Sequence, residues 1–530
     1  MITFRGQHTG MTWAGGDVAY DEGGIRAKLH DLSQASYVVQ GADGRIGVAN
    51  GGAIAPNGAY RLLGQSGAIS PAQLGNPDFQ TDYGVQYNYT AGAMANAIAS
   101  EDLVIALGNA GLLASFGAAG CVPPRLKAAI DKIKAALPNK PYAFNLIHSP
   151  SEEAMERNAV QMYLDNGIKI VEASAFLDLT PHIVWYRAAG LSQNPDGSVH
   201  IGNRVIAKLS RREVAILFMK PAPERLLQPL VEQGLISPLQ AQLAQRVPVA
   251  DDVTCEADSG GHTDNRPLVS LLPSILALRD EVQAQYNYAV PLRVGAGGGI
   301  STPSSALGAF MMGADYVVTG SVNQAALESG SSPHTKKVLA QADMADVAMA
   351  PAADMFEMGV KVQVLKRGTM FPMRAQRLYE LYVEHNSIDD IDPEERAKLE
   401  KQVFKRPLED IWADTVKFFT ERDPEQIQRA MDNPKRKMAL IFRWYLGLSS
   451  RWSNVGEKGR ELDYQIWCGP AMGAFNAWAK GSYLEVPENR HAVDIAHHIM
   501  TGATLLYRVG TLRVQGVNFA PHLTAYVPTK

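Results

Sequence analysis

A chain of 530 residues is too long for one ordinary hydrophobic core, so we expect two or three compact units. Hydrophobic residues make up 46% and charged residues 20%, which excludes a disordered chain. The net charge of −4 gives no overall attraction to nucleic acid or to an anionic membrane. Three widely spaced cysteines exclude a disulfide framework and a zinc ribbon. With no apolar signal core and no membrane-length apolar run, we expect a cytoplasmic protein.

The first eighty residues predict a small β-rich cap. Short alternating stretches at 36–39 and 45–48 are separated by turn residues at 43–44 and 57–58. We assign residues 1–80 to this cap.

Strand-like and helix-like stretches then alternate eight times. The predicted strands cover 85–89, 111–115, 142–146, 169–173, 205–209, 253–257, 292–295 and 316–319. Helical patterns fill the intervals, and the one at 212–245 is broken at Gly234. A doubly wound open sheet shows the same alternation with fewer strands. Eight strands in a span close to the ~250 residues of a TIM (β/α)₈ barrel favour the barrel, and we assign 81–335 to it.

After residue 335 the strand signal fades. Long, charged, amphipathic segments at 374–385, 393–422 and 424–446 predict helices, with a loop at 386–392. We expect residues 336–530 to form a mainly helical substrate or lid domain over the mouth of the barrel, at the carboxyl ends of its strands.

Two glycine-rich segments directly follow predicted strands seven and eight. The first is GAGGGIS, from Gly295, and the second is TGSVNQ, from Thr319. Glycine lets backbone N–H groups approach a ligand, and loops seven and eight of this fold are the usual phosphate site. The two segments therefore predict a phosphate site. The alternative is that the glycines only turn the chain.

A third segment, EADSGGH, follows predicted strand six and ends at His262. Histidine titrates near neutral pH, so His262 is a candidate for proton transfer or for polarising a substrate. Gly260 and Gly261 allow a flat ring to lie against the main chain. The alternative is that His262 only forms a hydrogen bond to a cofactor phosphate or to a neighbouring loop.

These motifs carry a family resemblance. E-A-x-x-G-G-H followed by A-G-G-G-I and T-G-S resembles the FMN-dependent nitronate monooxygenase and FabK-type enoyl reductase superfamily. Longer stretches resemble PfaD, the trans-acting enoyl reductase of polyunsaturated fatty acid and related polyketide synthases. They are GLLASFGAAG at 111–120, YAFNLIHS at 142–149, VEASAFL at 171–177, KLSR at 208–211, ADMFEMGVKVQVLKRG at 353–368 and GPAMGAFNAWAKG at 469–481. The likeness covers almost the whole chain.

The resemblance implies an FMN-dependent enoyl reductase that uses NADPH or NADH. Its substrates would be trans-2-enoyl thioesters on the acyl carrier protein domains of a multidomain synthase, and a homodimer is compatible with this role. By position, Ala93 and Met94 would lie against the flavin edge, and Asn145 would bond to the flavin or its ribityl chain. The FMN phosphate would be held by Gly298, Gly299, Gly320 and Ser321, and His262 would lie near the substrate carbonyl.

One departure from the superfamily pattern bears on His262. Asp258 and Ser259 are two extra residues where the superfamily often reads E-A-G-G-H. They leave the position of the imidazole open.

Lys208 lies in the otherwise apolar strand predicted at 205–209. A cation near the flavin N1–C2 carbonyl would stabilise the reduced ring, so Lys208 is a candidate cofactor-binding residue. The alternative is that Lys208 pairs with Glu172 or Glu256 as part of the protein scaffold.

Three other functions remain open. A nitronate monooxygenase-type oxidase would use the same cofactor with oxygen as the acceptor. A flavin-free scaffold protein would only bind carrier domains, and a barrel lyase would use Lys208 as a Schiff base. A basic stretch is a candidate contact for an acidic carrier protein; it comprises Lys361, Lys366, Arg367 and Arg374. His491, His497 and His498 have no carboxylate in a ligand pattern, so we predict no metal site.

Overall fold

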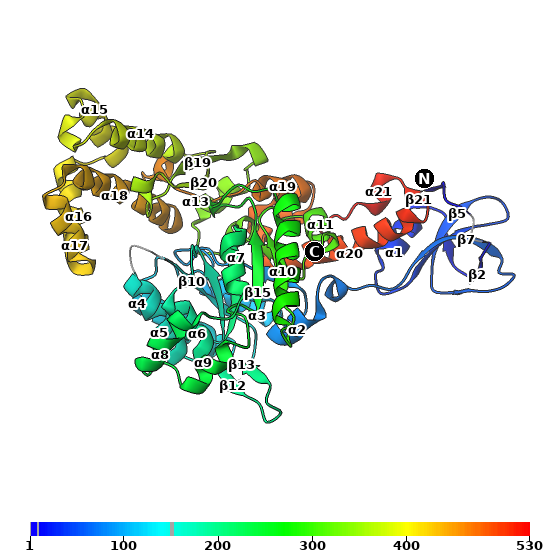
Figure 1. Cartoon of the computed structure of the whole chain (residues 1–530). Coiled ribbons are helices and arrows are strands. Elements are labelled where there is room, and N and C mark those ends of the chain that lie inside the picture. The colour runs from blue at the N-terminus through cyan, green and yellow to red at the C-terminus, as the bar shows by residue number, and fades with distance from the viewer. Residues whose placement is uncertain (1, 8–9, 149–152) are drawn as a thin grey trace.

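The computed structural model describes residues 2–7, 10–148 and 153–530, which contain a closed barrel of eight parallel strands (Figure 1). In order around the barrel the strands are β8 (Tyr89–Ala91), β9 (Leu113–Phe116), β10 (Ala143–Ile147), β11 (Ile170–Ser174), β14 (Arg204–Leu209), β15 (Asp252–Glu256), β17 (Arg293–Gly297) and β18 (Val317–Thr319). β18 closes the ring by pairing with β8. The predicted barrel is therefore confirmed. Its first strand begins at Tyr89 rather than at residue 85, because 85–88 lead in from a helix that ends at Gly84.

Six barrel strands are each followed by a single long helix. These helices are α3 (Glu101–Asn109), α4 (Pro123–Ala136), α5 (Glu153–Asp165), α6 (Pro181–Ala189), α10 (Leu268–Tyr286) and α11 (Pro303–Met311). Ser100, Thr180 and Thr302 begin three of them by accepting a backbone N–H of the first turn. Predicted strand five is followed instead by α7 (Arg212–Met219), α8 (Glu224–Glu232) and α9 (Pro238–Ala244). The predicted break at Gly234 lies between α8 and α9.

The eighth helix of the barrel comes from the end of the chain. After β18 the chain forms only the short α12 (Ser321–Gln324), and α20 (Ala492–Val514) packs between α11 and α3. The contact with α11 is close, because a Cβ added at Gly502 would lie 2.5 Å from Pro303. Residues far apart in sequence thus complete one βα unit.

The excursion between α12 and α20 is mainly helical, as predicted. It contains α13 (Pro333–Leu339), α14 (Phe371–Glu384), α15 (Pro393–Lys398), α16 (Leu408–Arg422), α17 (Pro424–Met431), α18 (Pro434–Val455) and α19 (Ala471–Ala479). It also contains a hairpin that the sequence analysis did not predict, β19 (Val347–Pro351) and β20 (Lys361–Leu365). β20 pairs with β16 (Gly261–His262), which lies in the loop after β15. The excursion is therefore joined to the barrel mouth by a shared sheet.

The N-terminal cap is a six-stranded antiparallel sheet in the order β3-β5-β4-β7-β2-β6. Its strands are β2 (Thr12–Ala14), β3 (Val18–Ala19), β4 (Ser36–Gln40), β5 (Ile46–Asn50), β6 (Ala53–Ile54) and β7 (Tyr60–Ser66), and α1 (Glu22–His30) packs on β5. In Figure 1 the cap and the helices α14 to α18 of the excursion lie on opposite sides of the barrel.

The end of the chain returns to the cap. β21 (Val517–Phe519) pairs with β1 (Ile2–Phe4). The buried Arg508 of α20 donates hydrogen bonds to backbone carbonyls of the cap and of the segment that follows it; these belong to Leu29, Asp31, Leu32, Gln34 and Gly67. The division into 1–80, 81–335 and 336–530 remains a proposal.

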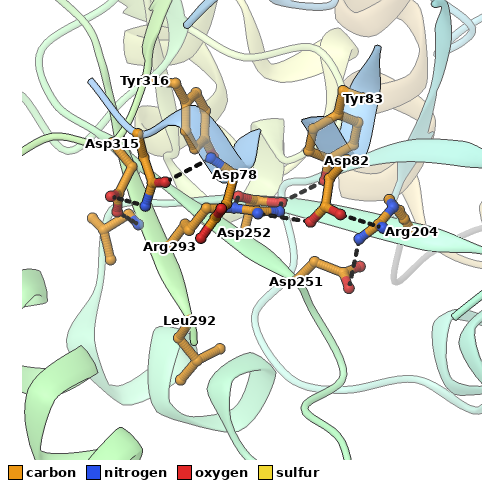
Figure 2. A network of polar contacts seen from close by, with 12 residues as sticks. Asp78, Asp82, Tyr83, Arg204, Asp251, Asp252, Leu292, Arg293, Asp315 and Tyr316 are labelled. Carbon is orange, nitrogen blue, oxygen red and sulfur yellow. Dashed lines mark hydrogen bonds and ion pairs between the residues drawn. The ribbon is translucent and has the colours of Figure 1, made fainter. Parts of the chain in front are cut away.

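A buried ionic network closes the amino end of the barrel (Figure 2). Arg293, the first residue of β17, donates to both carboxylate oxygens of Asp252 at 2.6 and 3.0 Å, and to Asp82 at 2.7 Å. Asp82 lies on α2 (Pro77–Tyr83), and the Tyr83 hydroxyl also donates to Asp252. The network therefore fixes α2 across the amino ends of β15 and β17.

We predict that Arg293→Met costs about 3–5 kcal/mol of unfolding free energy, because it leaves the fully buried Asp252 without its cation. Urea denaturation measures this loss as a lower midpoint. The control is Lys127→Met, which breaks an exposed pair with Asp131 and should cost less than about 1 kcal/mol. Equal urea midpoints for the two variants would contradict the stabilising role assigned to the Arg293–Asp252 pair.

Candidate active site

Three of the predicted segments lie side by side at the barrel mouth. β15, β17 and β18 are parallel neighbours, with Glu256 opposite Gly297 and Gly297 opposite Val318. Because parallel strands end at the same edge, the loops after these three strands adjoin one another. They are called loops six, seven and eight below.

Loop seven contacts loop six closely. Gly298 has a φ of +84°, and a Cβ there would lie 2.6 Å from the backbone carbonyl of Ala257. Only glycine fits this position without displacing the backbone. The next residue, Gly299, has a φ of +76°, but the space where its Cβ would lie is open.

Among the described residues, loops seven and eight each hold polar groups that have no partner. A Cβ at Gly320 would also meet no atom within 4 Å. Within the part of the chain that the structure describes, the amides of Gly299 and Gly320 have no acceptor, and the buried Ser301 hydroxyl has no partner. Unpaired donors beside an open space are what a phosphate group requires. The residues present therefore fit the phosphate end of a mononucleotide.

Ser321 connects loop eight to the excursion. Its hydroxyl oxygen accepts a hydrogen bond from the Gly469 amide at 3.2 Å. Three residues earlier in the same segment, the Ile466 carbonyl accepts a hydrogen bond from the Leu365 amide of β20. The segment before α19 therefore covers loop eight.

Lys208 lies between two carboxylates, as the structural alternative predicted. Its Nζ is 3.5 Å from Glu172 and 3.4 Å from Glu256. Burial alone would lower the pKa of Lys208, but the two carboxylates outweigh burial and raise it. A lysine held protonated in this way is a poor Schiff-base nucleophile, which argues against the lyase alternative.

Glu172 links this ion cluster to the predicted flavin-edge residues. Its carboxylate accepts the Ala93 amide at 3.2 Å, and burial raises its pKa against the opposing effect of Lys208. The Asn145 side-chain nitrogen donates to the backbone carbonyl of Glu172 at 3.0 Å and to Ser174 at 2.8 Å. The structure thus brings Ala93 and Lys208 to the Glu172 carboxylate, and Asn145 to the backbone carbonyl of the same residue.

Backbone strain accumulates at the same mouth. Asn96 and Ala97, after β8, each have a φ of +56°, and Ala175, after β11, has a φ of +60°. Such conformations cost about 1–3 kcal/mol each and cluster at functional sites. The backbone of Met94, two residues before Asn96, is packed tightly, because a Cβ on Gly117 would overlap the Met94 carbonyl oxygen.

His262 is positioned by the excursion. It lies in β16 opposite Val362 of β20, and its Nε2 is 3.2 Å from a carboxylate oxygen of Asp354. Gly261 has a φ of +81°, and a Cβ on Gly260 would lie 2.8 Å from the Cys468 backbone. These two glycines thus shape loop six and let it pack against the excursion.

The extra residue Asp258 anchors loop six. Its carboxylate accepts hydrogen bonds from Gln363 at 2.6 Å and from Asn265 at 2.9 Å. Gln363 lies on β20, so the departure from the superfamily pattern adds a contact to the excursion. The position of the imidazole, which the sequence left open, is set by this contact and by strand pairing.

Sequence reasoning missed the role of Asp354 and Gln363. Both lie in the stretch 353–368 that carried part of the family resemblance, which was their only signal.

The predicted basic stretch of Lys361, Lys366, Arg367 and Arg374 is not one continuous exposed surface, because Arg374 forms an interior ion pair with the fully buried Asp463.

The electrostatic surroundings of His262 favour its charged form. Burial lowers its pKa, but the hydrogen bond and charge of Asp354, aided by Glu256, outweigh burial and the repulsion from Lys208. The pKa of His262 is therefore raised above the ordinary value of 6.5, so its ring stays protonated closer to neutral pH than a free imidazole does.

We predict that Asp354→Asn lowers the pKa of His262, because it removes the negative charge beside the ring. NMR titration of the His262 ring protons measures the change. In the wild type this ion pair stabilises the fold below about pH 6.5, and the contribution is lost as the pH rises through the raised pKa of His262.

The matched control is Glu22→Gln, which removes the carboxylate beside His522 and should leave the His262 titration unchanged. An Asp354→Asn protein with the wild-type His262 pKa would contradict the assigned pairing.

The described residues contain neither a metal-binding cluster nor a helix that could span a membrane. In residues 2–7, 10–148 and 153–530, no group of three or more His, Cys, Asp and Glu could hold a metal ion. No helix in the described portion combines the length and apolar character needed to cross a membrane. His491 and His498 have separate partners, Glu328 for the first and Tyr483 and Tyr526 for the second.

Three family models match the chain. The nitronate monooxygenase model matches residues 79–388. The model of the N-terminal domain of fatty acid synthase subunit PfaD matches residues 13–65. The model of the inserted helical domain of acyl-carrier-protein S-malonyltransferase matches residues 385–464, within the helical excursion.

Individual proteins are also similar. One of the polyunsaturated fatty acid synthase subunits of Thraustochytrium sp. is 50% identical over 460 residues, which are 85% of this chain and 31% of that protein. Polyketide biosynthesis protein PksE of Bacillus subtilis is 46% identical over 83% of this chain and 57% of its own length. The chain thus spans about a third of the first relative and just over half of the second. The crystal structure of the enoyl reductase domain of MlnA, from the macrolactin biosynthesis cluster of Bacillus amyloliquefaciens, is 38% identical with a TM-score of 0.79. That match covers 83% of this chain and 99% of the MlnA domain.

Proposed function

The chain belongs to the PfaD-type branch of the nitronate monooxygenase family, and on this premise we propose that it is an FMN-dependent enoyl reductase. Its proposed substrates are trans-2-enoyl thioesters on acyl carrier protein domains of a fatty acid or polyketide synthase, with NADPH or NADH as the reductant. The observation that carries this proposal is the meeting of open glycine loops and the His262–Asp354 pair at one barrel mouth. The likeness to the MlnA enoyl reductase domain supports it.

The proposed cofactor site uses the free groups of loops seven and eight. The amides of Gly299 and Gly320 and the hydroxyls of Ser301 and Ser321 would bind the FMN phosphate, and Gly298 would keep loop seven against loop six. Ala93 and Met94 follow β8, Asn145 lies within β10, and these three residues would contact the ring. When bound, the reduced flavin would supply the hydride that is added to the β-carbon of the enoyl group, and a proton added at the α-carbon would complete the reduction.

His262 has the central role in the proposed chemistry. Its imidazolium would donate a hydrogen bond to the thioester carbonyl and stabilise the negative charge that develops on that oxygen. Asp354 holds the ring and favours its charged form. Lys208 adds a fixed positive charge at the mouth, balanced by Glu172 and Glu256. The segment bonded to Ser321 would limit the access of water.

We predict that His262→Ala keeps bound flavin but slows its reoxidation by crotonyl thioester about 10²-fold or more, because the developing charge loses its donor. Its reduction by NADPH should change far less. Stopped-flow absorbance measures the two half-reactions separately, and His200→Ala, on an exposed strand, is the control. Equal slowing of both half-reactions would instead make His262 a cofactor-positioning residue.

We predict that Gly320→Asp folds but retains flavin at least tenfold more weakly. The open space at Gly320 accommodates the side chain, while its charge repels a phosphate. Gly320→Asn is nearly isosteric and uncharged, so it should retain much more flavin. The flavin content of each variant after dialysis measures its retention. Equal retention by Gly320→Asp and Gly320→Asn would place the phosphate elsewhere.

The family model over residues 79–388 also favours a second candidate, a nitronate monooxygenase-type oxidase. Under anaerobic conditions the proposed reductase should consume NADPH only when an enoyl thioester is present. Consumption that requires oxygen, yields peroxide and ignores the thioester would favour the oxidase.

A further inference from the structure

A cavity of about 210 Å³ lies at the carboxyl ends of β9 and β10, between α4 and α5. Much of its wall is apolar and comes from Cys121, Leu126, Leu146, Met155, Ala159 and Met162. Because it lies after β9 and β10, and not after β17 and β18, the cavity is distinct from the loops assigned to the cofactor phosphate.

Glu156 and Tyr163, two buried polar residues of the cavity wall, have partners within the protein. The buried carboxylate of Glu156 accepts from the Thr180 hydroxyl with one oxygen and lies 3.0 Å from the His148 ring with the other. The Tyr163 hydroxyl donates to the backbone carbonyl of Asn145 at 2.6 Å. A ligand therefore need not supply hydrogen bonds to these groups, and an apolar ligand leaves none of them unpaired.

The cavity adjoins the proposed catalytic pair. Asp354 and Met355 form part of its wall, and Asp354 is the residue that holds His262. A molecule seated in the cavity therefore lies beside the carboxylate that orients the imidazole.

We propose that this cavity binds the acyl chain of the enoyl thioester. This inference rests on the proposed function and deepens it. At ~30 Å³ for each water-sized group, the cavity holds roughly seven carbons beyond the reacting double bond. The exposed Asn158 also lines the cavity, and a longer chain would continue past it.

The alternative occupant is the nicotinamide dinucleotide, which the wall does not suit. Of the described residues that form it, none is lysine or arginine, and the buried Glu156 is acidic. The phosphates of a dinucleotide would have no cationic partner there.

The first test uses enoyl-pantetheine substrates of four, eight and twelve carbons. In the wild type, kcat/KM should rise about fourfold for each buried methylene group and level off once the cavity is full. Ala159→Phe reduces the cavity, so it should lower the ratio of kcat/KM for octenoyl over crotonyl substrate at least tenfold. The control Ala154→Phe makes the same change at an exposed position of α5 and should leave the ratio unchanged.

A second readout needs neither turnover nor flavin. Cys121 is partly exposed to the cavity, whereas Cys255 and Cys468 are fully buried, so a thiol reagent should label Cys121 selectively. Octanoyl-pantetheine should slow this labelling, and acetyl-pantetheine should not.

The outcomes separate this inference from the proposed function. Protection of Cys121 without any enoyl reduction would support the acyl site while overturning the reductase. The acyl site alone would be overturned if the protein reduces the crotonyl substrate but octanoyl-pantetheine does not protect Cys121 and Ala159→Phe leaves the octenoyl-to-crotonyl ratio of kcat/KM unchanged. Slower NADPH oxidation in Ala159→Phe, equal for every substrate, would also overturn it and assign the cavity to the dinucleotide.

Discussion

The parallel pairing of β15, β17 and β18 is the constraint on which the rest of the structure depends. Because the three strands run side by side in the same direction, loops six, seven and eight leave the barrel at the same edge. Gly298 then allows loop seven to lie against the backbone of loop six, where a side chain would collide. Gly299 and Gly320, which have open space at the Cβ position, and the unpaired Ser301 hydroxyl lie in loops seven and eight at this edge.

The excursion is a second requirement of the site, because the barrel alone does not position His262. β20 pairs with β16, Asp354 holds the imidazole, and Gly469 bonds to Ser321. The chain then returns as α20, which packs between α11 and α3 and continues to the N-terminal cap. The helical segments are therefore joined to the barrel at loop six, at loop eight and through the last helix.

The sequence predicted what depends on local pattern. Alternation identified all eight barrel strands, and the glycine segments identified the loops that meet at the mouth. It missed what depends on long-range pairing. Lys361–Leu365 alternates polar and apolar residues, yet the alternation did not reveal that this strand pairs with β19 in one hairpin and with β16 about a hundred positions away. Asp354 has no local signal of a role, since it acts only through His262 in space.

Other features were ambiguous for the same reason. A lysine in an apolar strand is compatible with a cofactor contact and with an ion pair, and only the positions of Glu172 and Glu256 identified the pairs that Lys208 forms. The place of α20 in the barrel could not be predicted either, because helical periodicity shows which face is buried but not what covers it.

The most direct test of the account is the visible absorption of the purified protein during anaerobic additions of NADPH and then crotonyl thioester. The account predicts flavin absorption that bleaches with NADPH and returns with the thioester while oxygen is absent. A colourless protein that binds no added FMN, or a bleached flavin whose colour returns only when oxygen is admitted, would contradict it.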